Sequence, residues 1–202
     1  MNKRQYCLDR MYRVVRDQVG FTSADWRLFA PFLNIREVDS RHILQATGES
    51  ANNHHFVVRG LVRFFYITQE GKELNKGFYG EDYIVGSLSS VILNEPSRFS
   101  IATLEPCTLV ELRLDQLQKL QGRCASWDRL FEYCCQMMLV RNERREAELL
   151  TLSAKERFQR FVHNFPGYIQ RIPQYHIATY LGITPEALSR FKKQWLSEDR
   201  GN

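Results

Sequence analysis

Between residues 35 and 114 the chain is built from short runs of apolar or alternating residues. The runs read HILQAT, HHFVVRG, LVRFFYIT, KGFYG, DYIVGS, FSIATL and TLVELR, and the breaks between them hold Gly48, Gly60, Gly71, Gly80 and Asn94-Glu95-Pro96. Evenly spaced strands of about five to eight residues are typical of antiparallel all-β architectures. This region therefore predicts an antiparallel β-barrel or jelly roll.

Helical periodicity flanks this region on both sides. Residues 1 to about 35 read as short amphipathic helices. Beyond Leu114, residues 115–120 predict a brief helix, and Ser126 is placed to cap a long helix that runs to about Thr151. A helix of about 25 residues spans roughly 37 Å, more than a compact domain of this size needs. Such a helix is expected to pair with a copy of itself, with the core helix of a monomer as the alternative.

The apolar face of the long helix is interrupted by Arg141 and Arg145. After it, Ser153 and Glu156 have the spacing of a capping box. Gly182 then ends one short helix, and Thr184-Pro185 opens the next with an N-cap followed by proline at the first helical position. These signals predict a tight helix-turn-helix.

The predicted helix pair has the packing residues that such a motif needs. Apolar side chains fall where the two helices meet, at Ile177, Leu181, Ile183 and Leu188, and a small one, Ala178, lies at their closest approach. A pair packed in this way can hold its second helix outward into a DNA major groove, which is about 12 Å wide. A helical hairpin without a DNA role remains the alternative.

Charge supports a polyanion as partner for the last quarter of the chain. The whole sequence has a net charge of +5, and the part after Leu152 holds eight Lys or Arg and four Asp or Glu. The preceding part is almost neutral. A small basic C-terminal unit indicates contact with nucleic acid, although a solvated basic face would look the same.

Composition excludes several other classes. The chain of 202 residues is 44% hydrophobic, as expected for a folded protein. Since it has no apolar run near the roughly 20 residues of a membrane helix and no signal-peptide pattern at its start, we expect a cytoplasmic location. The cysteines lack CxxC spacing, which argues against disulfides, a zinc site and an iron-sulfur cluster; they are Cys7, Cys107, Cys124, Cys134 and Cys135. No cofactor or metal is expected.

Two segments of the sequence resemble the Crp/Fnr superfamily of bacterial transcription regulators. HIATYLGITPEALSRFKK is similar to the helix-turn-helix of one branch of that superfamily, and GEDYIVGSLSSVILNEPSRFSIATLEPCTLVEL resembles its strand, phosphate-binding loop and following strand. The resemblance implies an α+β chain with three parts. These are a cyclic-nucleotide-binding-like β-barrel or jelly-roll sensor in residues 1–125, a dimerisation helix in 126–151 and an all-α helix-turn-helix domain in 152–202.

The resemblance also implies partners and DNA-contacting residues. The partners would be double-stranded DNA, a second copy of the chain and RNA polymerase. Thr184 would meet a phosphate, whereas Glu186, Ser189 and Arg190 would face base edges, with Arg190 able to bind O6 and N7 of guanine. Further phosphate contacts are expected from Gln174, Lys192 and Lys193.

The effector site that the resemblance implies is altered. The family holds a cyclic phosphate with a Gly-Glu pair and an Arg-Ser or similar pair, and here the first pair aligns as Gly86-Ser87, without the glutamate. The tentative effector-binding residues are Gly86, Ser87, Ser97, Arg98 and Asn142. Arg98 would take the place of the phosphate-binding arginine if the loop shifts by one position. A cyclic nucleotide, another small anionic effector and an empty barrel all remain open.

The features of the sequence bear on three functions. The first is a DNA-binding transcription regulator, which a small ligand in the β-barrel could control. The basic C-terminal unit, the helix pair and the long helix agree with this function. The alternative is a ligand-sensing module that acts on a protein partner without DNA. An enzyme of the cupin kind is not expected, because the sequence has no cluster of His and acidic ligands and no nucleophile with a partner base.

Overall fold

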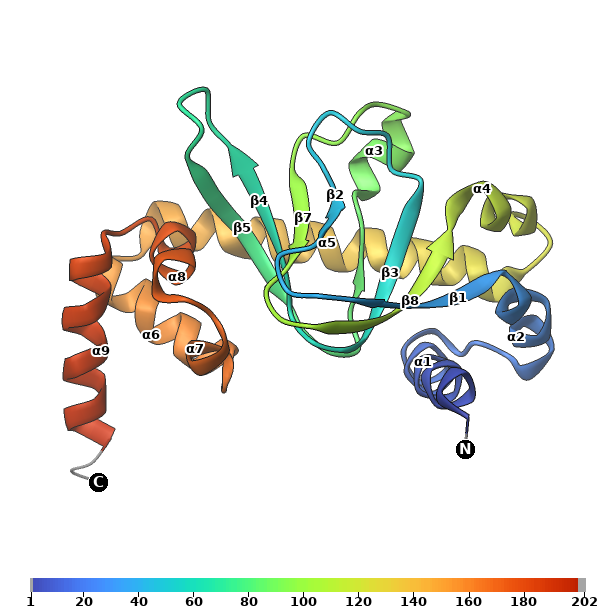
Figure 1. Ribbon diagram of the computed structural model, residues 1–202, viewed down its shortest axis with the longest axis horizontal. Coiled ribbons are helices and arrows are strands. Elements are labelled where there is room, and N and C mark those ends of the chain that lie inside the picture. The colour runs from blue at the N-terminus through green and yellow to red at the C-terminus, as the bar shows by residue number, and fades with distance from the viewer. Residues whose placement is uncertain (1, 200–202) are drawn as a thin grey trace.

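The structure is a computed structural model and describes residues 2–199. Figure 1 shows a central β-domain, a long helix α5 running behind it, and helices at both ends. The N-terminal helices are α1 (Lys3–Val19), α2 (Ser23–Phe29) and the 3₁₀ turn Ala30–Phe32. The strands are β1 (Leu33–Val38), β2 (Ile43–Gln45), β3 (Asn53–Arg59), β4 (Val62–Ile67), β5 (Glu73–Tyr79), β6 (Ile84–Val85), β7 (Ser100–Thr103) and β8 (Cys107–Arg113).

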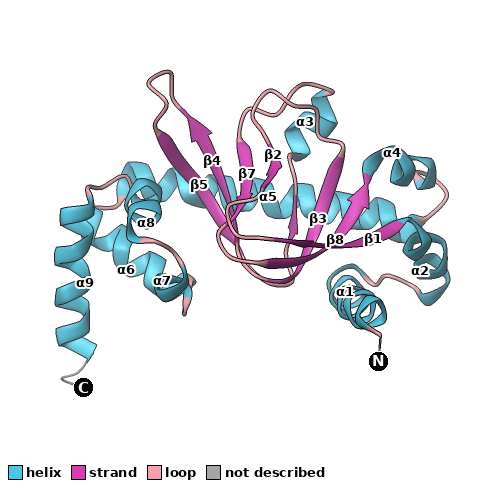
Figure 2. Cartoon of the chain, in the orientation of Figure 1, coloured by secondary structure: helices cyan, strands magenta, loops and turns pink. Residues whose placement is uncertain are grey.

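The strands form two antiparallel sheets of four, in the orders β1-β8-β3-β6 and β2-β7-β4-β5 (Figure 2). This confirms the antiparallel β-domain predicted from the sequence. Strand β3 is buried on both faces, which explains its continuous apolar run. Phe56 and Val58 pack toward the N-terminal helices, whereas Val57 belongs to the cluster between the sheets.

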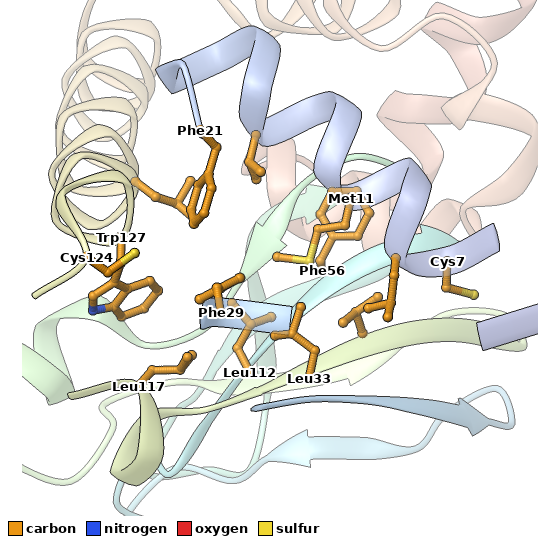
Figure 3. Packing of buried hydrophobic residues seen from close by; sticks show 14 of the residues in the cluster. Cys7, Met11, Phe21, Phe29, Leu33, Phe56, Leu112, Leu117, Cys124 and Trp127 are labelled. Carbon is orange, nitrogen blue, oxygen red and sulfur yellow. The ribbon is translucent and has the colours of Figure 1, made fainter. Parts of the chain in front are cut away.

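The N-terminal helices cover the outer face of the sheet that holds β1, β8 and β3. Figure 3 shows Met11 of α1 beside Phe56 of β3, with Phe21, Phe29 and Trp127 joining these helices to α5. The rings of Phe29 and Trp127 are stacked with centroids 5.6 Å apart. This packing anchors the first turns of α5 to the β-domain.

Helix α5 extends from Ala125 to Thr151, close to the predicted range, and its 27 residues span about 40 Å. Its start differs from the sequence prediction. Ser126 lies inside the first turn and does not cap it; instead its backbone N–H donates to the Asp25 carboxylate of α2 at 3.0 Å. A residue remote in sequence therefore supplies the acceptor that a local N-cap would have provided.

The remaining helices lie in the β-domain and in a compact C-terminal unit after α5, called the head. They are α3 (Leu88–Leu93) and α4 (Leu114–Leu117) with the 3₁₀ turn Gln118–Leu120 in the β-domain, and α6 (Ala154–Asn164), α7 (Tyr168–Arg171), α8 (Gln174–Leu181) and α9 (Pro185–Asp199) in the head. The capping box of Ser153 and Glu156 is present at the start of α6. No helix within residues 2–199 combines the length and apolarity that crossing a membrane requires.

The head is docked on the β-domain by an apolar contact and a buried polar one. Phe78 of β5 packs on Tyr180 of α8, with ring centroids 5.3 Å apart. Beside them the Asn75 side-chain amide donates to Thr179 Oγ1 at 2.6 Å and to the backbone carbonyl of His176 at 3.3 Å. Arg63 Nη1 donates to Asn75 Oδ1 at 3.3 Å. Satisfied buried polar groups of this kind fix the relative position of two units, because a displaced partner would leave donors unpaired.

This docking should make the protein sensitive to acid. Burial, and then the charge of Arg63, lower the pKa of His176 to about 4, while its side chain is 4% exposed. A folded-state pKa below the unfolded value of about 6.5 means that the contribution of this group is present above pH 6.5 and is lost as pH falls toward 4. At pH 5 the expected loss of unfolding free energy is about 2 kcal/mol from His176 alone.

Urea unfolding of the unmodified protein and of His176→Gln at pH 7 and pH 5 tests this expectation. The variant should lose about 2 kcal/mol less than the unmodified protein over this pH interval. Equal losses in the two proteins would show that His176 does not titrate in this range. His54, which burial likewise gives a pKa of about 4, contributes equally to both measurements and therefore cancels.

Candidate functional site

The helix-turn-helix of α8 and α9 is assembled by the residues that the sequence identified. Gly182 ends α8 with φ of 66°, a left-handed conformation that glycine adopts at little cost. At the start of α9, Thr184 Oγ1 accepts a hydrogen bond from the backbone N–H of Ala187 at 3.2 Å. Ile177, Ala178 and Leu188 are each at most 1% exposed. Helix α9 is thus held by its inner face alone.

The outer face of α9 is polar, and the predicted DNA-contacting residues are distributed unevenly over it. One shallow hollow on this face is lined by Pro185, Glu186, Ser189, Arg190, Lys193 and Gln194. The structure thus brings the predicted base-reading residues onto one surface, together with Lys193. Thr184 and Gln174 are exposed at the first turns of α9 and α8, whereas Lys192 is half-buried on the flank.

The predicted phosphate cradle after β6 is closed by its own side chains. Ser87 and Ser97 are 0% and 2% exposed, and the Ser97 hydroxyl donates to the Phe99 carbonyl at 2.8 Å and lies 3.1 Å from Ser87 Oγ. Arg98 points away from them, with a side chain 80% exposed and 3.5 Å from Glu95. These tentative effector-binding residues are therefore not brought together around one space.

The interior between the sheets is occupied by aromatic rings. Phe64 lies between Tyr79 and Phe99, with centroid distances of 4.3 Å and 5.1 Å. All three side chains are at most 5% exposed. Protein interiors are close-packed, so a purine base could enter here only if these rings moved.

Open space lies instead along α5, in a groove of about 580 Å³ between that helix, the β-domain and the head. Gly86 and Asn142, two of the tentative effector-binding residues, line it, whereas Ser87, Ser97 and Arg98 do not. The groove also receives Tyr79 from β5 and Tyr180 from α8. It is therefore bounded by all three parts of the chain.

Two arginines that the sequence analysis noted only as interruptions shape this groove. The Arg141 guanidinium lies 4.0 Å from the centroid of the Tyr79 ring, and its Nη2 donates to the Phe78 carbonyl at 2.8 Å. The Arg145 guanidinium lies 4.0 Å from the centroid of the Tyr180 ring and bonds the Tyr180 carbonyl. Their spacing of four residues on an apolar helix face was the signal that could have placed them in a site.

Metal binding has no support in the described part of the chain. Within residues 2–199, no group of three or more His, Cys, Asp or Glu side chains could hold an ion. His54 and His55 are both buried, but they lie on opposite faces of β3, as alternation along a strand requires.

Comparison with known proteins places the fold. The cyclic nucleotide-binding domain family matches residues 35–123. A curated relative, the anaerobic regulatory protein of Haemophilus influenzae, is 25% identical over 169 residues, which are 77% of this chain; the match covers 64% of the relative's length.

Solved structures extend the likeness to nearly the whole chain. FixK2 of Bradyrhizobium japonicum is 18% identical with a TM-score of 0.75, covering 83% of this chain and 86% of FixK2. The c-di-GMP-responsive global regulator CLP of Xanthomonas campestris is 20% identical with a TM-score of 0.70, covering 88% and 93% of the two chains. Residues 35–123 therefore match the cyclic nucleotide-binding domain family, and the chain shares the fold of FixK2 and CLP.

Proposed function

We propose that this protein is a DNA-binding transcription regulator of the Crp/Fnr type. The observation that carries the proposal is the outer face of α9, where Arg190 and Lys193 are exposed while the opposite face is buried against α8 and α6. A helix held in this way can enter a major groove without losing its packing. The named relatives are regulators as well, in agreement with this role and with a non-enzymatic protein.

Base reading and backbone contact are divided along α9. Arg190 reads guanine, Glu186 and Ser189 contact neighbouring base edges, and Thr184 meets a phosphate at the first turn. Gln174, Lys192 and Lys193 complete the phosphate contacts. Glu186 is an anion on this face, because hydrogen bonds from its own backbone and from Thr184 lower the pKa of its carboxyl.

The active unit is a homodimer held by α5. Along this helix, Leu139 and Leu150 are 60% and 77% exposed, and neither lines the groove. They are 11 residues apart, about three turns, and therefore lie on one side of α5. Exposed apolar side chains along one side of a long helix are typical of an interface. The chain then divides into a sensor in residues 1–125, a dimerisation helix in 126–151 and a DNA-binding domain in 152–202, and acts in the cytoplasm on DNA and RNA polymerase.

Light scattering at micromolar concentration tests the dimer. The expected mass is twice the 23.9 kDa of one chain. A monomer in the presence and in the absence of DNA would contradict the assignment of α5 as a dimerisation helix.

Selection of bound sequences from a random duplex pool, followed by anisotropy titrations at several salt concentrations, tests DNA binding. We expect a near-palindromic site bound at least about a thousandfold more tightly than random duplex. The logarithm of the affinity should fall linearly with the logarithm of salt concentration, because phosphate contacts release counterions. If no sequence is enriched and no duplex binds, the proposed function is wrong.

A further inference from the structure

The groove along α5 carries an excess of positive charge at the end near the head. Among the described residues that line it, four are cationic and two are acidic, namely Lys76, Arg141, Arg144 and Arg145 against Asp82 and Glu148. Asp82 is already neutralised from outside the groove, because Arg10 bonds both of its carboxylate oxygens at 2.7 Å and 3.0 Å. The arginine end of the groove therefore attracts an anion.

Arg145 is a largely buried cation with one unpartnered nitrogen. Its side chain is 16% exposed, and its nearest carboxylate oxygen, on Glu148, is 3.8 Å from Nη1. That Nη1 atom is buried, and no hydrogen-bond partner for it is found within residues 2–199. Burial lowers the pKa of Arg145, which reflects the cost of holding the charge there. A bound anion would remove this cost, since a buried charge is tolerated when it is paired.

The other end of the groove presents several apolar side chains. Ile84, Leu88 and Met138 line it where it approaches Gly86, and Cys134 lies on the same face of α5. The 11 residues from Cys134 to Arg145 correspond to about 16 Å along the helix. Methionine side chains adapt to irregular apolar ligands at little cost. The groove thus suits an elongated molecule with an apolar body and a charged end.

We propose that this groove binds an organic acid with an extended alkyl body, whose carboxylate pairs with Arg145 and Arg144 while the alkyl chain lies along Met138 toward Leu88. The site includes Gly86 and Asn142 of the effector residues that the family resemblance implies, but none of the implied phosphate-binding side chains Ser87, Ser97 and Arg98. The predicted phosphate cradle is closed by Ser87 and Ser97, and the interior beyond it is filled by Phe64 and its neighbours.

Ligand in this groove would regulate the proposed DNA binding, and this part rests on the proposed function. The acid would contact β5 through Lys76 and Tyr79, α5 through Arg145, and the head through Tyr180. A ligand held by parts of two units stabilises the arrangement in which it binds. It would therefore fix the head in its docked position.

Isothermal titration of the full-length protein with decanoate, and with decanol as the uncharged counterpart, tests the site. Decanoate should bind at least about tenfold more tightly than decanol, because a charge-assisted hydrogen bond is lost with the carboxylate. Arg145→Gln and the exposed variant Arg144→Gln should each weaken decanoate binding several-fold and leave decanol binding unchanged. Arg98→Gln, which removes an exposed cation outside the groove, is the matched control and should leave both affinities within about twofold.

Arg144→Gln keeps the test valid if Arg145→Gln fails to fold, since the Arg144 side chain is exposed and supports no packing. The proposal is overturned if decanoate and decanol bind with equal affinity, or if decanoate shows no saturable binding. It is also overturned if Arg98→Gln weakens decanoate binding as much as Arg144→Gln does.

Hydrogen exchange separates the site from the DNA-binding role. Decanoate should slow exchange of the backbone amides in Phe161–Tyr180, where the head meets β5, in the absence of any DNA. Slower exchange together with failure to bind every duplex would retain the acid site and remove the proposed function. DNA binding with unchanged exchange in this segment, at saturating decanoate, would remove the acid site and retain the proposed function.

Discussion

Placing glutamate at both Leu139 and Leu150 is expected to convert the protein from a dimer into a monomer and to weaken binding to a two-half-site duplex by about a hundredfold or more. These side chains are 60% and 77% exposed in the single chain, so the substitutions remove little buried apolar area from it. In a dimer joined through α5 they would bring like charges together in an apolar interface. Two linked heads gain about 10² to 10⁴ in affinity from effective concentration, and a monomer loses this gain.

Ile92→Glu provides the matched control. Ile92 of α3 is 59% exposed and is not among the residues that line the groove along α5. That variant should keep the dimer mass in light scattering and the DNA affinity of the unmodified protein. If the Leu139 and Leu150 double variant stays dimeric with unchanged DNA binding, another surface must join the two copies.

The local elements of this protein could be predicted from its sequence because each is specified by nearby residues. The capping box of Ser153 and Glu156, the turn at Gly182 and the N-cap Thr184 act within three or four residues of themselves. The start of α5 could not be predicted in the same way. The backbone N–H of Ser126 in its first turn donates to Asp25, which lies about a hundred residues away in the sequence. Local sequence patterns do not indicate a contact between residues so far apart.

The candidate effector site shows the same limit. Alignment by resemblance gives Ser97 and Arg98 as neighbours of a phosphate, but backbone direction decides which side chain points inward, and it turns Ser97 in and Arg98 out. Arg141 and Arg145 appeared in the sequence only as breaks in an apolar face. Their meaning depends on Tyr79 and Tyr180, which the fold brings to α5 from β5 and α8.

Arg190→Ala is expected to weaken specific DNA binding by about 1 to 3 kcal/mol per half-site, and so by about 2 to 6 kcal/mol for the dimer. The guanidinium can make two parallel hydrogen bonds to guanine O6 and N7, and alanine leaves those acceptors unpaired. Base preference should relax at one position in each half-site, whereas binding to random duplex should weaken much less. Anisotropy titrations on the selected site and on random duplex measure both effects.

Lys193→Ala should behave differently although Lys193 lines the same hollow as Arg190. It lies nearly one turn further along α9, where a helix that enters the groove by its first turns leaves the bases and meets the backbone. Its removal should weaken specific and random duplexes about equally and lower the salt slope by about one counterion per subunit. Lys155→Ala removes an exposed cation at the start of α6 and controls for the general effect of lost charge.

The comparison of the two variants decides how α9 is oriented on DNA. If Arg190 reads a base, the ratio of specific to random affinity falls for Arg190→Ala and stays constant for Lys193→Ala. If both variants lose the same affinity on both duplexes, α9 lies across the phosphate backbone and another element reads the bases. A loss of specificity in Lys193→Ala but not in Arg190→Ala would mean that the helix enters the groove by its C-terminal turns. In that orientation Lys193 would lie next to the bases and Arg190 next to the phosphate backbone.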